Sequence, residues 1–231
     1  MAAEGPGPKG VGRLDPEHVA RLAAMRRIYE HGGLDESDLA ADWLTQFRGW
    51  LDDAVGAGLS EPNAMIVATA TADGVPTART VLLKGVDQRG FVFFTHYTSR
   101  KGRQLAANPA ASLVFPWHPI QRQVLVTGVV ERVAAAESDA YFASRPRGAQ
   151  LGAAASRQST VIGSRGELEA ARDALAALYP DGTQIPRPAT WGGLRVVPDS
   201  VEFWQGRPDR LHDRLRFRRD GGAWVVERLS P

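Results

Sequence analysis

The densest group of residues able to bind an anion lies within residues 77–101, TARTVLLKGVDQRGFVFFTHYTSRK. Arg79 and Lys84 stand at the ends of one apolar run, and Arg100 and Lys101 follow a second one. Guanidinium and ammonium groups hold phosphate through charge-assisted hydrogen bonds, each contributing about 1.5–3 kcal/mol. Any one of these cations taken alone is better interpreted as a solvated strand end. Together they predict a phosphate site at the edge of a sheet.

The same stretch is predicted to form two β-strands, because β-branched, aliphatic and aromatic residues at 80–83 and 91–95 flank a Gly-Val-Asp-Gln-Arg-Gly linker. Side chains alternate along a strand, so Arg79 and Lys84 are expected on opposite faces. One phosphate is then hard to reach from both residues. Two phosphates, or a β-bulge, would resolve the conflict.

A second candidate site lies in residues 202–214, EFWQGRPDRLHDR. Arg210, His212 and Arg214 occupy alternate positions, so an extended backbone would direct all three side chains the same way, beside Trp204. A lone His in such a segment would more often be structural. Three aligned polar residues next to an indole favour a ligand site.

Two shorter segments carry polar groups suited to a planar, phosphorylated ligand. Tyr141 and Arg145 are four residues apart and are expected on one face of a helix. The run Ser-Arg-Gln-Ser at 156–159 offers small polar side chains for a ring edge. The five His residues show no metal-ligand spacing, and HExxH, Walker A and G-x-S-x-G motifs do not occur, which disfavours metal and serine-hydrolase chemistry.

Composition narrows the class of protein further. The 231 residues contain no Cys, which excludes disulfides, thiolate nucleophiles and Cys-based metal sites. The formal charge is +2 with acidic and basic residues interspersed, so nucleic acid is a weak hypothesis. No stretch is apolar enough for a membrane span or a signal peptide, so the expected location is the cytoplasm, with no membrane partner. A disordered tail is expected over residues 1–13, and a single domain over residues 14–231.

Hydrophobic periodicity predicts helices first and strands later. One helix should begin at Asp15 and Pro16, turn Val19, Leu22, Ala23 and Ile28 inward, and end at Gly32-Gly33. The strand at 64–71 and the pair within 77–95 should form a three-stranded antiparallel meander. The other predicted helices are 42–58, 99–108, 135–144 and 164–178, and the other strands are 111–116, 122–133, 191–197, 200–205, 215–219 and 223–229. Antiparallel strands with inserted helices indicate an α+β barrel.

From about residue 26 to residue 231 the order of motifs resembles the pyridoxine (pyridoxamine) 5'-phosphate oxidase family. The matching motifs are RRIY, EPNAM, RTVLLK, SRK, FPW, RQV, YFASRPR, SRQS, WGG, EFWQG and RLHDR. The resemblance implies an FMN-binding split β-barrel that works as a homodimer, with two FMN sites at the subunit interface. It also implies oxidation of pyridoxamine or pyridoxine 5'-phosphate to pyridoxal 5'-phosphate, with oxygen as electron acceptor and hydrogen peroxide as product.

Carried over position by position, the resemblance assigns site residues. FMN would be held by Arg79, Thr80, Val81, Leu82, Leu83, Lys84, Phe94, Thr95, Arg100, Lys101, Gln123, Gln158, Ser159, Trp204 and Arg214. Substrate would meet Arg26, Arg27, Ile28, Tyr29, Lys84, Tyr141, Arg145, Ala149, Arg210, Leu211 and His212, with Arg210 and His212 as the catalytic pair. In this assignment Arg79 serves the FMN phosphate and Lys84 the substrate phosphate.

The chain departs from the family pattern at a few positions. Ala149 stands where the family often has Ser, which removes one hydroxyl donor to the substrate phosphate. Ile28 replaces an acidic residue and Ala154 a bulky aromatic one. Two alternatives stay open: a related flavin oxidase of phenazine assembly, and a non-enzymatic flavin-binding or stress protein on the same barrel. The YFASRPR phosphate clamp disfavours the first, and the full C-terminal segment disfavours the second.

Overall fold

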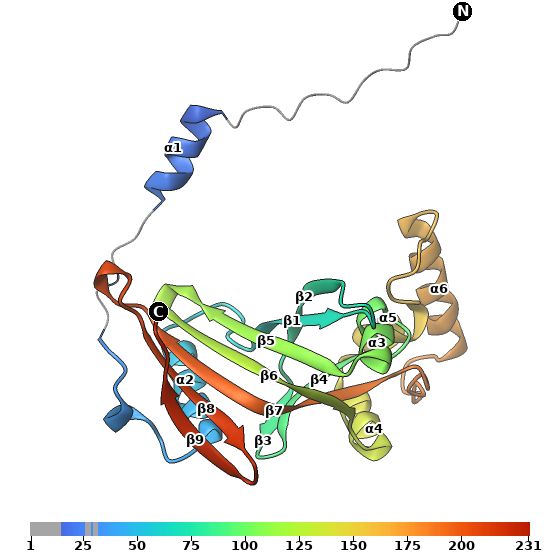
Figure 1. Ribbon diagram of the computed structural model, residues 1–231. Helices are drawn as coiled ribbons and strands as arrows, with labels where there is room; N and C mark the ends of the chain where they lie inside the picture. Colours follow the sequence, from blue (N-terminus) through green and yellow to red (C-terminus); the bar gives the residue numbers. More distant parts are fainter. Residues whose placement is uncertain (1–14, 26–28, 30–31) are drawn as a thin grey trace, which may run out of the picture.

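The computed structural model describes residues 15–25, 29 and 32–231 (Figure 1). An antiparallel sheet of nine strands runs in the order β2-β1-β5-β6-β7-β4-β3, with β8 paired to β7 and β9 to β8. The strands are β1 (Ala64–Ala70), β2 (Pro76–Leu82), β3 (Gly85–Asp87), β4 (Gly90–His96), β5 (Ala110–Trp117), β6 (Arg122–Arg132), β7 (Trp191–Gln205), β8 (Asp213–Asp220) and β9 (Ala223–Arg228). The α-helices are α1 (Pro16–Ala24), α2 (Trp43–Gly56), α3 (Arg100–Ala107), α4 (Ala135–Ser144), α5 (Arg147–Ala155) and α6 (Arg165–Leu178).

Helices occupy both ends of the curved sheet. Figure 1 places α2 beside β8 and β9, while α3, α4, α5 and α6 gather at the opposite end. Asp42 caps α2 by accepting hydrogen bonds from the backbone of Leu44 and Thr45. Phe47 of α2 is fully buried, and its ring centroid lies 4.9 Å from those of both Phe91 and Phe115. The aromatic core therefore lies between α2 and the sheet, leaving the other end of the sheet for a ligand site.

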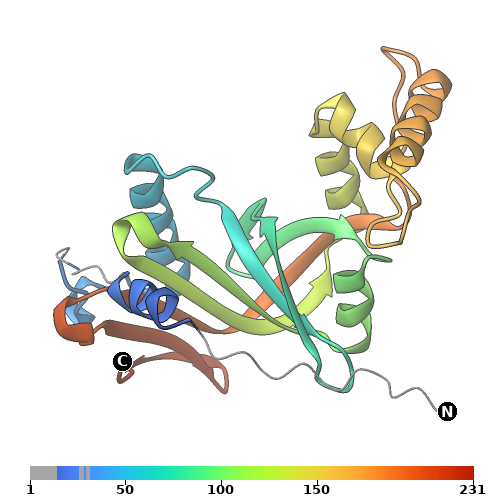
Figure 2. The same ribbon diagram turned by 90° about the horizontal axis from the view of Figure 1, so that it is seen from above.

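The helix predicted from Asp15 begins as expected but is shorter. Asp15 accepts a hydrogen bond from the backbone of Glu17, and α1 ends at Ala24, well before the predicted stop at residues 32–33. The inward face predicted for it is wrong for the single chain, because Val19 and Leu22 are 42% and 54% exposed. Figure 1 shows α1 standing away from the sheet, and in the view from above in Figure 2 it projects over one end of the sheet. Ile28 and the predicted tail lie outside the described residues.

The predicted three-stranded meander is also wrong. β2 pairs with β1, but β4 pairs with β3 and β7. The consecutive residues Phe91, Val92 and Phe93 are all buried, so both faces of β4 are covered, as in the interior of a sheet. β2 is half-exposed, which suits a strand at the edge of the sheet. Because β2 ends at Leu82, strand alternation does not extend to Lys84, and the predicted conflict of faces does not arise.

One long strand replaces the two predicted at 191–197 and 200–205. β7 runs through Pro198, and the β6–β7 register shifts between Thr127 and Gly128, so that Asp199 of β7 has no register partner in β6 and forms a bulge. A Cβ on Gly128 would collide with the carbonyl oxygen of Val197. The hairpin of β5 and β6, and the helices α3, α4 and α6, agree with prediction within a few residues. Within the described ranges, no helix is both long and apolar enough to cross a membrane.

Candidate active site

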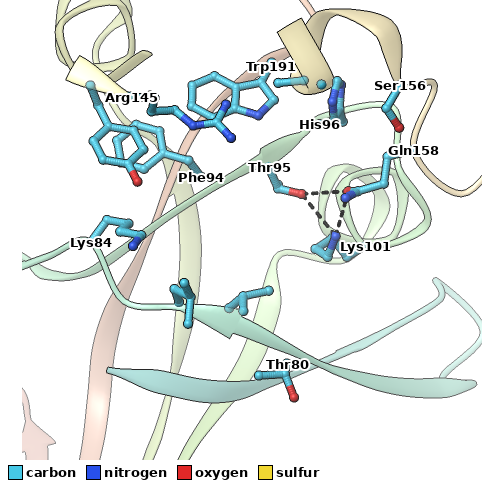
Figure 3. A pocket seen from close by; sticks show the side chains of 15 residues that line it. Thr80, Lys84, Phe94, Thr95, His96, Lys101, Arg145, Ser156, Gln158 and Trp191 are labelled. Carbon is cyan, nitrogen blue, oxygen red and sulfur yellow. Dashed lines mark hydrogen bonds between the residues drawn. The ribbon is translucent and has the colours of Figure 1, made fainter. Parts of the chain in front are cut away.

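A cavity of about 430 Å³ opens at the end of the sheet that α3, α4 and α5 cover (Figure 3). It lies between the end of β2, the end of β4 and the first residue of β7. Its lining comprises Thr80, Val81, Leu82, Lys84, Phe94, Thr95, His96, Lys101, Tyr141, Arg145, Gly152, Ala153, Ser156, Gln158 and Trp191. The structure thus brings together residues that the sequence placed in separate segments.

Lys101 is the buried cation at one side of this cavity. Ser99 caps α3 by accepting a hydrogen bond from Gly102 N, which places Lys101 in the first turn. The side chain is 8% exposed and donates to Thr95 Oγ1 at 3.1 Å and Gln158 Oε1 at 2.9 Å (Figure 3). Burial, and then the charge of Arg79, lowers the pKa of Lys101 to about 8. Within the described residues no carboxylate pairs with it, and a buried ammonium with only neutral partners favours binding of an anion.

Arg145 is the second cation of the cavity, and its side chain is half-buried. It caps the C-terminal end of α4, and its Nη1 is buried without a hydrogen-bond partner in the part of the chain that the structure describes. Burial lowers the pKa of Arg145, and the nearby Tyr141 acts in the opposite direction. The Tyr141 ring stacks on Phe94 with centroids 3.9 Å apart. Donors and a stacked aromatic wall therefore share one space, which suits a planar anion.

Several predicted cofactor residues do not line the cavity. Arg79 donates to the Val67 carbonyl at 3.1 Å, to Thr69 Oγ1 at 2.7 Å and to the Thr77 hydroxyl, so its guanidinium is engaged within the β1–β2 hairpin. Leu83 is buried in the core. Arg100 and Ser159 are exposed beside the cavity without lining it.

The remaining predicted residues lie at the other end of β7. The rings of Trp204 and His212 are 4.7 Å apart, and Tyr29 lies 6.0 Å from the first and 5.7 Å from the second. His212 Nδ1 accepts a hydrogen bond from the backbone of Arg207 at 3.1 Å. Burial, and then Arg210, lowers the pKa of His212. Gln123 joins this group because it is paired with Trp204 in the sheet.

The predicted alignment of Arg210, His212 and Arg214 is wrong. Asp209 and Arg210 have φ angles of 55° and 64°, so the backbone turns there and becomes extended only from residue 213. Arg214 instead forms a two-pronged ion pair with Glu202, at 2.8 and 3.1 Å. Arg210 and Leu211 are exposed. The short helical turn that follows Pro208 breaks the alternation that the sequence pattern assumed.

The predicted site therefore falls into two groups on one chain. Trp191 begins β7 and Trp204 is its last residue but one, on the order of 40 Å away along an extended strand at about 3.3 Å per residue. The C-terminal group, comprising Gln123, Trp204, Arg210, Leu211, His212 and Arg214 with Tyr29, is not in the cavity of the same chain. Arg26, Arg27 and Ile28 lie outside the described residues.

Some lining residues were not assigned a cofactor or substrate contact from the sequence, although Ser156 lies in the polar run 156–159 that was expected to meet a ring edge. His96 is buried, and burial followed by the charges of Lys101 and Arg145 lowers its pKa. Trp191, Ser156, Gly152 and Ala153 line the same space. Trp191 belongs to the WGG motif and Ser156 to the SRQS motif, so membership of a family motif was the sequence signal that could have identified these two as site residues. Ala149 is half-buried on α5 and does not line the cavity, and neither does the half-buried Ala154.

Comparison with known proteins gives this arrangement a family. The family profile described as "Pyridoxamine 5'-phosphate oxidase" matches residues 51–178, and the "Pyridoxine 5'-phosphate oxidase C-terminal dimerisation region" matches residues 191–231. A protein of Salinispora arenicola named pyridoxine/pyridoxamine 5'-phosphate oxidase is 63% identical over 200 residues, covering 86% of this chain and 90% of that protein. One of the same name from Thermosynechococcus vestitus is 58% identical, covering 92% of this chain and all of that protein (100%).

Solved structures agree with the fold. PhzG from Burkholderia lata 383, in complex with tetrahydrophenazine-1-carboxylic acid, superposes with a TM-score of 0.81 at 36% identity, covering 86% of this chain and 98% of that one. A pyridoxamine 5'-phosphate oxidase-related, FMN binding protein of Nostoc punctiforme has a TM-score of 0.64 at 19% identity, covering 84% of this chain and 99% of that one. The α+β split-barrel prediction is confirmed. This chain belongs to the pyridoxamine 5'-phosphate oxidase family.

Proposed function

We propose that this protein oxidises pyridoxamine 5'-phosphate or pyridoxine 5'-phosphate to pyridoxal 5'-phosphate, with oxygen as final acceptor and hydrogen peroxide as product. The observation that carries the proposal is Arg145, a half-buried residue whose buried Nη1 has neither a hydrogen-bond partner nor a carboxylate partner among the described residues. It lines one cavity with Lys84 and Tyr141. Such a set needs an anionic ligand to compensate its charge, and a phosphate ester supplies one.

FMN fits the other side of the cavity. Lys101 is buried with only the neutral partners Thr95 and Gln158, beside the N-terminal end of α3. That donor set suits the terminal phosphate of a mononucleotide. Thr80, Val81, Leu82 and Phe94 provide further lining on the β2 and β4 side. When bound, FMN supplies the hydride-accepting ring, and the protein supplies orientation and charge.

The chain's own residues then have separate tasks. Lys84, Tyr141 and Arg145 bind the substrate phosphate, which fixes the distance from that phosphate to the reacting carbon. Phe94 and Tyr141, stacked at 3.9 Å, form an apolar wall that excludes water from the ring. Arg210 and His212 cover the pyridine ring and orient its C4' substituent.

A second copy of the chain completes the site in this proposal. Arg210 and His212 lie far along β7 from the cavity of their own chain, so they serve the cavity of a partner. The match of residues 191–231 to a dimerisation region supports a homodimer with two shared sites. Gln123, Trp204 and Arg214, at the same end of the sheet, would then contact FMN of the partner cavity.

A flavin oxidase acting on a phenazine precursor is the second candidate. The similarity to PhzG, with 36% identity and a TM-score of 0.81, favours it. The phosphate-type group of Lys84, Tyr141 and Arg145 argues against it, because a ligand such as tetrahydrophenazine-1-carboxylic acid carries no phosphate. The two candidates differ in the substrate that is turned over.

Turnover by the purified yellow protein tests the proposal. Incubation with pyridoxamine 5'-phosphate should yield pyridoxal 5'-phosphate and hydrogen peroxide in equal amounts. Flavin released by heat should be identified by chromatography as FMN. Stoichiometric FAD, or a monomeric mass in solution with flavin still bound, would contradict the cofactor and the shared site respectively. Turnover of tetrahydrophenazine-1-carboxylic acid, with none of pyridoxamine 5'-phosphate, would favour the second candidate.

A further inference from the structure

Trp191 provides the aromatic face against which Arg145 lies. The guanidinium carbon of Arg145 is 4.9 Å from the centroid of the Trp191 ring, and Figure 3 shows the two groups side by side. The indole is 5% exposed, stacks on Phe94 at 5.4 Å and meets the edge of Phe142 at 5.2 Å. Packing therefore fixes the indole before any ligand binds.

The backbone of Trp191 is also tied to the helix that carries Arg145. Trp191 N donates to the Pro188 carbonyl at 2.9 Å, and the Trp191 carbonyl accepts from Arg187 Nη1 at 2.6 Å. Arg187 Nε in turn donates to Asp139 of α4 at 2.6 Å. Since α4 is capped by Arg145, these bonds tie the first residue of β7 to the helix from which the guanidinium extends.

Trp191 is the nearer of two aromatic rings that face Arg145, since the centroid of Phe142 lies 5.9 Å from the guanidinium carbon. Within the described residues the Arg145 guanidinium forms no ion pair, and Nη1 makes no hydrogen bond. A long side chain without a partner samples many rotamers, which costs entropy when a ligand orders it. Arg stacks well on indole, and the attraction grows when the pair is removed from water.

We propose that Trp191 is a positioning residue that holds Arg145 in place, leaving Nη1 free for a ligand phosphate. The inference rests on the proposed function in which Arg145 binds the substrate phosphate. Trp191 acts through Arg145 and not on the reacting carbon. It thereby increases the preference of the site for phosphorylated over unphosphorylated pyridines.

A double-mutant cycle tests this role. Trp191→Leu should raise KM for pyridoxamine 5'-phosphate by about 5- to 30-fold, the range expected for a desolvated cation–π contact, with kcat and FMN content retained. Trp191→Phe keeps an aromatic face and should recover most of the loss. In an Arg145→Met background, Trp191→Leu should add less than about a twofold change, because the two residues act as one unit. Equilibrium binding of pyridoxal 5'-phosphate should weaken in parallel, and binding of unphosphorylated pyridoxal should not.

Trp224→Leu is the matched control. Trp224 lies 5.1 Å from the guanidinium carbon of Arg219, far from the cavity, so its loss removes a similar contact without changing KM. Thermal melts identify any variant that fails to fold, and Trp191→Met then replaces Trp191→Leu in the cycle. An unchanged KM in Trp191→Leu, or losses that add fully in the double mutant, would overturn the inference. A wild-type protein that neither turns over pyridoxamine 5'-phosphate nor binds pyridoxal 5'-phosphate would instead defeat the proposed function.

Discussion

The cations of the cavity and those of the C-terminal hairpin differ in their partners. Most hairpin arginines are matched with carboxylates, in the pairs Arg214–Glu202, Arg216–Glu227, Arg218–Glu227 and Arg228 with Glu36 and Asp213. In the cavity, Lys101 is buried and Arg145 is half-buried with a buried Nη1, yet neither forms an ion pair with the described residues. Charges in pairs hold strands together, whereas a buried charge without a counter-charge is costly and marks a place for an anionic ligand.

Arg210, like Arg219, is a C-terminal cation without an ion pair among the described residues, and its removal gives the largest expected effect. It is exposed and forms no ion pair in the described part of the chain. Arg210→Ala and His212→Ala should each lower kcat on the order of a hundredfold, because a reacting atom misplaced by about 1 Å can cost that much. Steady-state kinetics with FMN content measured in parallel checks this. Full turnover with flavin bound would remove both residues from the site.

Arg145→Met should have the next largest effect, on binding. Loss of a charge-assisted contact of about 1.5–3 kcal/mol predicts about a ten- to hundredfold increase in KM, with kcat largely kept. Arg216→Met removes a paired cation and provides the control, with KM unchanged. The comparison fails if both variants change KM equally.

Lys101 should make FMN affinity depend on pH. Its pKa near 8 means that the ammonium form, which binds the phosphate, is lost as pH rises through 8. Affinity of the flavin-free protein for FMN should therefore fall by about tenfold per pH unit above that value while this one group titrates. Fluorescence titration of FMN from pH 6.5 to 9.5 measures the trend, and Lys101→Met should flatten it. A wild-type affinity that is flat across this range would be inconsistent with a role for Lys101.

The stability linkage of Lys101 has the opposite sign. Its folded-state pKa of about 8 lies below the ordinary 10.5, so the unfolded chain binds more protons between these values. The contribution of Lys101 to the stability of the flavin-free protein should accordingly rise with pH over that window. Chemical denaturation of the wild type and of Lys101→Met at pH 7.5 and 9.5 measures the free energy of unfolding of each. The change of their difference with pH is the contribution of Lys101.

The smallest effect is expected in the hairpin. Glu227 accepts from both Arg216 and Arg218, which lowers its pKa, so Glu227→Gln should reduce the melting temperature slightly at pH 7. The difference in melting temperature between the variant and the wild type should shrink as pH falls through the lowered pKa of Glu227. Below that pKa the Glu227 carboxyl is protonated, so it is neutral like the glutamine that replaces it. KM and kcat should stay as in the wild type, and a change in either would show that the hairpin pairs also serve the site.

Local patterns predicted much of the fold. The helix start at Asp15, the helix predicted over 164–178 and the β5–β6 hairpin follow from short-range sequence signals, and the structure has them. Strand partners depend on which faces are buried in the whole sheet, so the continuous burial of β4 overrode the expectation that neighbours in sequence pair. The length of α1 and the exposure of its apolar face likewise depend on contacts beyond its own sequence.

The candidate site was predicted in part. Lys101, Tyr141 and Arg145 meet in one cavity as motif membership suggested. Alternation failed at Arg210, where the left-handed backbone breaks the extended chain. The role of the indole of Trp191 could not be read from spacing, because the contact with Arg145 joins residues 46 positions apart across two elements.

The bulge at Asp199 of β7, beside Gly128 of β6, sets the alignment between the two halves of the site. β7 carries Trp191 at its first residue and Trp204 near its last, and the register shift opposite Gly128 lies between them. A methyl group at residue 128 would collide with the Val197 carbonyl, so one end of β7 would have to slide or rotate relative to the other. In the proposed dimer, each cavity is built from the first end of β7 of one chain and the last end of β7 of the other. A methyl group at residue 128 would therefore misalign the residues of both cavities, although it contacts neither cavity.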